Sequence, residues 1–259
     1  MATLSAEGGT RGATSGSRLP DRYHGNAFQP FDDFVARALR PGVRILDIGA
    51  GRRPMLGPDR RPPGCHYVGL DVSATELSLA PSGSYDETWA KDVTTHIPDL
   101  DGRFDLIVSW QVLEHVKPME TAIANIHRYL APGGRFVALL SGSFAAFAIL
   151  NRLIPDRLGK LLMKRLLHRD PKTVFTAHYD RCRNGALRQM LATWHATEIV
   201  PISIGAVYFG FSPPIQKLYL AYENWAVRGE HKNLATHYII TAGRAPAADH
   251  DAGPGAPRA

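Results

Sequence analysis

Short apolar runs rich in β-branched residues recur along the chain, separated by segments of helix length. Continuous runs of this kind are typical of parallel strands that are buried on both faces. They predict strands at residues 43–48, 66–71, 88–93, 104–110, 135–141, 197–204 and 236–243. The alternation favours an α/β fold with a doubly wound sheet, in which ligands bind beyond the carboxyl ends of the strands.

One helix is predicted between the fourth and fifth strands. Ile123, Ile126 and Leu130 are spaced for one face of a helix over 119–130, and "APGG" follows with proline and glycine stops. The polar ends of the chain look different, because they are rich in Gly, Ser, Pro and Ala and poor in large apolar residues. We expect a disordered leader over 1–20, one domain over 21–243 and a disordered tail over 244–259.

Composition adds three expectations. The chain has 259 residues, 44% of them hydrophobic, which suffices for one large core. Its two cysteines, Cys65 and Cys182, match neither a metal site nor a disulfide framework, so a reducing, cytoplasmic setting without a metal is expected. A net charge of +6 permits contact with phosphate or an acidic membrane surface but does not require it.

Polar residues follow the first three strands at the edge where a ligand would bind. Gly49 and Gly51 allow a sharp turn after the first strand, which carries Asp47 near its end. Asp71 ends the second strand, where a carboxylate can accept hydrogen bonds from both hydroxyls of a ribose. Asp92 ends the third and could accept from an adenine amine. These features suit NAD and other adenosine cofactors alike.

The motifs "LDIGAG", "GLD", "DV", "FDLIVS…VLEHV" and "LAPGGRF" follow in this order over residues 40–142. In this the sequence resembles the class I S-adenosylmethionine-dependent methyltransferases, in the group that carries these motifs. The resemblance implies a seven-stranded Rossmann-like sheet with an antiparallel last strand, and S-adenosyl-L-methionine as cofactor. That cofactor has no pyrophosphate, so the third glycine of the dinucleotide fingerprint, replaced here by Pro54, is less needed.

Cofactor contacts carry over from the resemblance position by position. It puts Asp47, Gly49 and Gly51 around the methionine end. Asp71, with Val72 beside it, would hold the ribose, and Asp92 and Val93 the adenine. Ser109, Trp110 and Gln111 would form the loop along the sulfonium and the substrate.

Methyl transfer to a hydroxyl or amine requires the acceptor to lose a proton, so a general base near the methyl group helps. His115 in "LEHV" is the first candidate, and the alternative is a structural role at a helix start. His178 and Tyr179 in "FTAHYDRC" form a second candidate cluster, with a loop and helix cap as its alternative.

The chain departs from the family pattern between the first two strands, where "GRRPMLGPDRRPPG" contains four prolines. Proline removes backbone donors and breaks helix interiors, so the first crossover helix should be short, with Pro54 in its first turn. Arg52 and Arg53 either reach the cofactor carboxylate or, as exposed arginines usually do, point to solvent.

Two insertions are expected to form a helical and aromatic cap over the sheet. The first, about 142–195, contains a basic amphipathic helix near 156–168, which either packs on the core or contacts a membrane surface. The second, about 204–234, carries six aromatic residues around "SPPIQ". We interpret it as a lid over an apolar substrate, although an ordinary helix interface would use the same residues.

These patterns favour an enzyme that methylates a hydroxyl or amine of a small, apolar, lipid-linked or glycan-linked metabolite in the cytoplasm, with peripheral membrane contact left open. A methyltransferase acting on RNA or another nucleic acid is a rival supported by the basic charge, but "SWQVLEHV" lacks the Asn/Asp-Pro-Pro-aromatic signature. A non-catalytic S-adenosylmethionine-binding protein is the third class. An NAD oxidoreductase is disfavoured because the chain has no Tyr-x-x-x-Lys pair.

Overall fold

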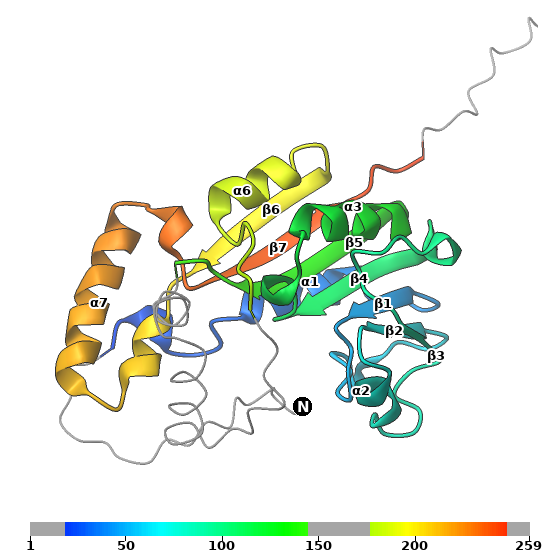
Figure 1. Cartoon of the computed structure of the whole chain (residues 1–259), viewed down its shortest axis with the longest axis horizontal. Helices are drawn as coiled ribbons and strands as arrows, with labels where there is room; N and C mark the ends of the chain where they lie inside the picture. Colours follow the sequence, from blue (N-terminus) through cyan, green and yellow to red (C-terminus); the bar gives the residue numbers. More distant parts are fainter. Residues whose placement is uncertain (1–18, 145–176, 248–259) are drawn as a thin grey trace, which may run out of the picture.

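The computed structural model describes residues 19–144 and 177–247, which form a seven-stranded sheet flanked by helices (Figure 1). The strands are β1 (Arg44–Ile48), β2 (His66–Asp71), β3 (Glu87–Ala90), β4 (Phe104–Trp110), β5 (Leu130–Ser141), β6 (His195–Ile202) and β7 (His237–Gly243). The α-helices are α1 (Gln29–Ala38), α2 (Ala74–Ser78), α3 (Met119–Tyr129), α6 (Asn184–Met190) and α7 (Pro213–Arg228). Short 3-10 helices are η1 (Asp21–Tyr23), η2 (Pro58–Arg60), η3 (Pro98–Leu100), η4 (Leu113–His115), η6 (Gly205–Phe209) and η7 (Lys232–Leu234).

The strand order is β3-β2-β1-β4-β5-β7-β6, and β7 runs in the opposite direction to the other six strands. This confirms the predicted seven-stranded α/β fold with its antiparallel last strand. The third strand ends at Ala90 rather than at residue 93, because the chain turns there and the Asp92 side chain accepts a hydrogen bond from the backbone N–H of Thr94. Asp92 therefore follows β3 instead of ending it.

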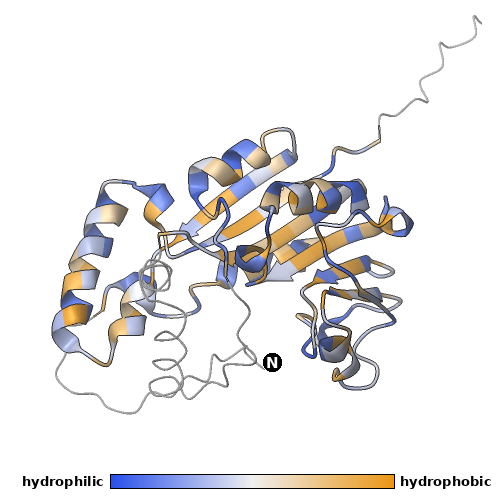
Figure 2. Ribbon diagram, in the orientation of Figure 1, coloured by the Kyte–Doolittle hydropathy of each residue, from blue (hydrophilic) through white to orange (hydrophobic). Residues whose placement is uncertain are grey.

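Alternating side chains bury both faces of the sheet. Leu46 and Ile48 of β1 belong to the core beneath α3 and α6, whereas Ile45 packs on the opposite face with Phe31 and Val35 of α1. Figure 2 shows the central strands as the most hydrophobic part of the ribbon. Burial on two faces explains why these strands read as continuous apolar runs in the sequence.

The crossover from β1 to β2 contains no α-helix, so the prediction of a short helix with Pro54 in its first turn was wrong. A polar staple holds this segment instead. Asp47 Oδ2 accepts hydrogen bonds from the Met55 backbone N–H at 2.8 Å and from the Tyr67 hydroxyl at 2.7 Å. The same hydroxyl accepts from the Leu56 N–H at 3.1 Å, and the Arg61 guanidinium lies over the Tyr67 ring at 3.8 Å. These five residues are called the Asp47 staple below.

Contacts with the sheet continue just past the end of β7. Arg244, the first predicted tail residue, donates from its backbone to Gly134 O at 3.1 Å and from its side chain to Leu130 O at 2.8 Å. The structure thus describes ordered contacts just past β7. The basic helix predicted near 156–168 lies outside the described residues, as do residues 1–18 and 248–259. Within the described part of the chain, none of the helices combines the length and the apolar character needed to cross a bilayer.

Candidate active site

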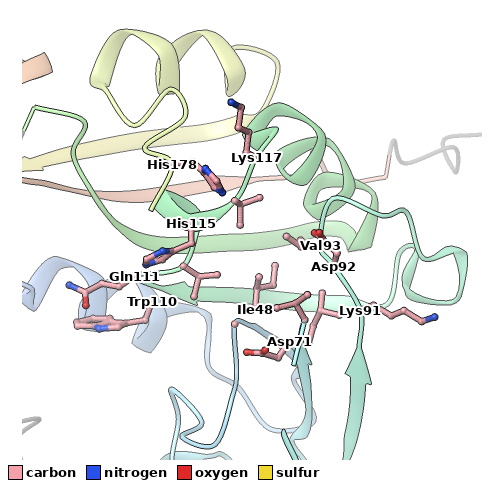
Figure 3. A pocket seen from close by; sticks show the side chains of 15 residues that line it. Ile48, Asp71, Lys91, Asp92, Val93, Trp110, Gln111, His115, Lys117 and His178 are labelled. Atoms are coloured by element: carbon pink, nitrogen blue, oxygen red, sulfur yellow. The ribbon is translucent and has the colours of Figure 1, made fainter. Parts of the chain in front are cut away.

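A cavity of about 530 Å³ opens at the carboxyl ends of β1, β2 and β4 (Figure 3). Its position agrees with the general rule that open α/β sheets bind ligands beyond their strand ends. The lining residues are Ile48, Gly49, Leu70, Asp71, Val72, Lys91, Asp92, Val93, Trp110, Gln111, Val112, His115, Val116, Lys117 and His178. The predicted cofactor residues that belong to this wall are Gly49, Asp71, Val72, Asp92, Val93, Trp110 and Gln111.

Gly49 lies in the cavity wall, packed closely against Val112. Its φ of 74° lies in the left-handed region, and a Cβ at this position would sit 2.1 Å from Val112 Cγ2. Glycine is required here both by the backbone conformation and by the approach of Val112. The nearby Gly51, with φ of 51°, donates its N–H to Asp71 Oδ2 at 3.0 Å.

Asp71 is the carboxylate best placed to meet a ligand. It is partly buried in the wall, and its oxygens accept from the N–H groups of Gly51 at 3.0 Å and Ser73 at 2.8 Å. An ionised carboxylate offers about four acceptor positions, so two remain after these bonds. Burial raises the pKa of Asp71 above its ordinary value, and the two N–H donors oppose that effect. The group is held rigidly and still has capacity for two donors from a ligand.

Asp47 does not line the cavity, in contrast to its predicted place around the methionine end. Its side chain projects to the α1 face of β1, where it is 2% exposed and forms the Asp47 staple. Burial raises its pKa to about 6, despite the hydrogen bonds from Met55 and Tyr67. Asp47 therefore holds the segment at Met55, which follows the glycine loop at residues 49–51. Tyr85 supports the loop itself by donating its hydroxyl to Ala50 O at 2.8 Å.

Past β3, Asp92 and Val93 reach the cavity as the resemblance implies. Asp92 Oδ1 accepts from both the N–H and the hydroxyl of Thr94 at 2.8 Å, which fixes the turn. Val93 is buried, and its carbonyl oxygen accepts from the Asn125 side chain at 2.9 Å. Lys91, which the sequence reading did not single out, also lines this side and donates its backbone N–H to Asp71 O.

Of the three loop residues predicted at the end of β4, Trp110 and Gln111 line the cavity and Ser109 does not. Ser109 lies within the strand, is fully buried, and does not line the cavity; its Oγ has no hydrogen-bond partner among the described residues. Trp110 lines the cavity and contacts the rings of Phe28 and Phe31 edge-on, with centroids 5.5 and 4.9 Å apart. Gln111 turns the chain into the cavity with a φ of 54°. A non-glycine residue held in this region is a strained position of the kind found at functional sites.

The candidate bases fall into two groups. His115 and His178 both line the cavity, and Figure 3 shows His178 across from Asp71. Tyr179 is 5% exposed and does not line it, because its backbone and that of His178 donate to Glu114 O and turn the tyrosine into the core. The next residue, Asp180, accepts from the Met119 N–H at 3.0 Å and so caps α3, which was the structural alternative for this segment.

Two further residues were missed by sequence reasoning. Lys117 lines the cavity on the side of His178, and a lysine after "LEHV" carried no recognisable signal. His237 is 1% exposed at the start of β7, where its ring contacts Phe28 at 5.5 Å. Burial lowers the pKa of His237 to about 4, so its imidazole is neutral at pH 7. Its Nδ1 has no hydrogen-bond partner among the described residues.

The paired arginines of the first loop are not in the cavity wall. Arg52 makes two hydrogen bonds with the Glu76 carboxylate, at 2.7 and 2.6 Å, and the pair is largely exposed. Arg53 is exposed as well. Both arginines therefore face solvent, which is the alternative to contact with the cofactor carboxylate.

Comparison with known proteins now identifies the class. A family model for a methyltransferase domain matches residues 23–197, about two thirds of the chain. The chain therefore belongs to this methyltransferase family, and the resemblance to class I S-adenosylmethionine-dependent methyltransferases is confirmed.

Among curated relatives, the chain is similar to the ubiquinone biosynthesis O-methyltransferase of Mesorhizobium japonicum, with 32% identity over 120 residues that cover 44% of this chain and 48% of that protein. The same enzyme of Brucella melitensis biotype 2 is 30% identical over 119 residues, covering 43% and 48%. The chain spans about half the length of these curated relatives.

Solved structures give the fold. Phosphoethanolamine N-methyltransferase 2 of Haemonchus contortus, in complex with S-adenosyl-L-methionine, aligns with a TM-score of 0.51 at 13% identity, covering 84% of this chain and 53% of that one. The [4+2]-cyclase SpnF aligns with a TM-score of 0.50 at 19% identity, covering 85% and 82%. At these identities the likeness extends to the fold alone.

Proposed function

We propose that this protein transfers a methyl group from S-adenosylmethionine to a hydroxyl group of a small molecule. The observation that carries the proposal is Asp71, whose carboxylate is held by two hydrogen bonds, has two acceptor positions left and lines the cavity. Gly49, also in the cavity wall, leaves no room for a side chain. A nucleoside with two ribose hydroxyls and a flat apolar base suits this arrangement.

The cavity residues divide the tasks of holding such a cofactor. Asp71 would accept from the ribose hydroxyls, and the apolar side chains of Leu70 and Val93 would contact the base. Asp92 would accept from the exocyclic amine, using the oxygen that Thr94 does not occupy. When bound, S-adenosylmethionine supplies a methyl group activated by its sulfonium.

Two histidines are proposed to handle the proton of the acceptor. His115 and His178 line the same cavity, and an imidazole side chain can act as a general base. Trp110 and Gln111, at the end of β4, would align the acceptor with the methyl group, which is most of what an in-line displacement requires. Tyr179 is left out of this assignment because its ring is in the core.

A hydroxyl acceptor is favoured over an amine by the curated relatives, which are O-methyltransferases. This support concerns the class of acceptor, because the aligned segment covers 44% of this chain and 48% of the Mesorhizobium japonicum enzyme.

Labelled-methyl transfer tests the proposal. The full chain is incubated with S-adenosylmethionine carrying a labelled methyl, and with a phenol, an aliphatic alcohol, a primary amine or total RNA as acceptor. Label in a hydroxyl acceptor is expected. Label in RNA alone would favour the nucleic-acid alternative, and label in the amine alone would contradict O-methylation. Binding of the donor without transfer to any of the four acceptors would favour the non-catalytic alternative.

A further inference from the structure

Helix α7 carries an apolar stripe that the rest of the described chain, residues 19–144 and 177–247, leaves exposed. Within α7, Ile215, Leu218, Tyr222 and Trp225 follow one another at intervals of three, four and three residues, which is the spacing of one helix face. Phe211 lies in the turn just before the helix. Four of these five residues are exposed large hydrophobics, at 67%, 46%, 74% and 55% for Phe211, Ile215, Leu218 and Trp225. These five residues are called the α7 stripe. None of them is among the residues that line the cavity.

The stripe faces outward because the other face of α7 is held against the protein by Glu223. Glu223 is 2% exposed and accepts from the Gly205 N–H at 2.5 Å and the Thr236 hydroxyl at 3.1 Å. It also pairs with Arg22 at 3.3 Å and hydrogen bonds to the Tyr23 hydroxyl. A buried carboxylate with this many partners sets the rotation of the helix about its axis, because turning the helix would leave the charge unpaired.

The charges beside the stripe are of one sign. Within α7 the acidic residue, Glu223, is buried, whereas Lys217 and Arg228 are exposed. These two cations lie eleven residues apart, about three helical turns, and so share one side of the helix. The next acid, Glu230, pairs with Lys232 at 3.8 Å. A second α7 placed against this one would bring cations together, whereas an anionic surface would complement them.

Aromatic and aliphatic side chains beside exposed cations are the pattern of a helix that lies in the interface of a membrane. We propose that the α7 stripe docks the protein on an anionic lipid surface, with Leu218 and Trp225 inserted and Lys217 and Arg228 at the headgroups. Figure 1 shows α7 past the end of β6, away from α2 and β3 at the opposite end of the molecule. The docking surface is thus separate from the cavity wall, and it stands whether or not the methyl transfer proposed above is correct.

Vesicle co-sedimentation of the full chain tests the docking surface. Phosphatidylcholine vesicles are compared with equal mixtures of phosphatidylcholine and phosphatidylglycerol. Binding to the mixed vesicles is expected, with loss of binding as salt screens the headgroup contacts. Leu218→Glu should weaken binding at least about tenfold, since it replaces an inserted side chain by a charge. Its matched control is Leu79→Glu, at the end of α2, where a leucine is 54% exposed far from the stripe and should leave binding unchanged.

Three outcomes would overturn the proposal: no binding to either vesicle, equal binding to both, or equal loss of binding in the Leu218 and Leu79 variants. Light scattering on the parent and on Leu218→Glu is run in parallel. A dimer that the Leu218 variant disrupts, without vesicle binding, would show that a second copy is the occupant and would also overturn it. Near-ultraviolet circular dichroism checks that each variant is folded. Both variants are expected to fold, because both leucines are exposed.

Discussion

At the scale of single residues, strand alternation decides which polar side chains reach the cavity. Asp47 shares the face of Ile45, and Ser109 shares the face of Ile107, so both point into the core rather than toward a ligand. That signal was present in the sequence as the period of two along each strand. Asp71 does line the cavity, because it ends its strand and the chain leaves the sheet there.

Gly49 gives a sharp test of the wall at this scale. Gly49→Ala should destabilise the protein by roughly 2–4 kcal/mol, because the new methyl meets Val112 and alanine disfavours a φ of 74°. Gly83→Ala is the matched control, since Gly83 has a φ of 78° with nothing near its Cβ position, and should cost only about 1–2 kcal/mol. Urea unfolding of both variants measures the difference. Equal losses would show that Val112 does not press on this position.

His237 predicts a pH dependence of stability. Its pKa falls from about 6.5 in the unfolded chain to about 4 in the fold, so the unfolded chain binds more protons between these values. Its stabilising contribution is therefore full above pH 6.5 and is lost as pH falls toward 4, by roughly 3 kcal/mol. Asp47, with its raised pKa of about 6, acts in the opposite direction within the same window.

His237→Phe isolates this effect, because Asp47 is common to both proteins. The free energy of unfolding of the variant, measured relative to the parent, should rise by up to roughly 3 kcal/mol between pH 7 and pH 4. Urea unfolding at several pH values gives the difference. A constant difference across this range would mean that His237 titrates normally in the fold.

At the scale of elements, the strands were predictable and the first crossover was not. Burial on both faces leaves a strong apolar signal, and β1, β2 and β4 appear within one residue of their predicted bounds. The crossover depends on side-chain contacts that no local pattern encodes, because Tyr67 and Met55 meet Asp47 only once β1 and β2 are paired. The α7 stripe was visible as an aromatic cluster, but whether it faces a cavity or solvent is decided by how Glu223 is held.

The Asp47 staple makes a prediction at this scale. Tyr67→Phe removes the hydroxyl that donates to Asp47 and accepts from Leu56, both in the core, and should destabilise the protein by roughly 1–3 kcal/mol. It should also raise the pKa of Asp47 further, since one of the bonds that stabilise its charged form is lost. Urea unfolding gives the first quantity, and its pH dependence the second. Unchanged stability would show that the staple does not hold the crossover.

At the scale of the whole molecule, two surfaces follow from one topology. The carboxyl ends of β1, β2 and β4 build the cavity, and the continuation of β6 carries η6 and α7 out to a separate apolar face. The first was expected from the sheet class, because ligands gather where the strands end. The second could not be predicted from the sequence, because exposure of Leu218 depends on how α7 is rotated about its axis. The proposed site for methyl transfer and the proposed surface for lipid thus lie on different parts of the described chain.

The central claim is that the cavity holds S-adenosylmethionine through Asp71, and isothermal titration calorimetry tests it most directly. The full chain is titrated with S-adenosylmethionine, S-adenosylhomocysteine and NAD. We expect one-to-one binding of the two sulfur compounds and none of NAD. Asp71→Asn should weaken binding about tenfold or more, because two hydrogen bonds to a charged acceptor are impaired, while Asp99→Asn, at an exposed carboxylate outside the cavity wall, should not. No heat with either sulfur compound, or equal affinity in the Asp71 and Asp99 variants, would contradict the account.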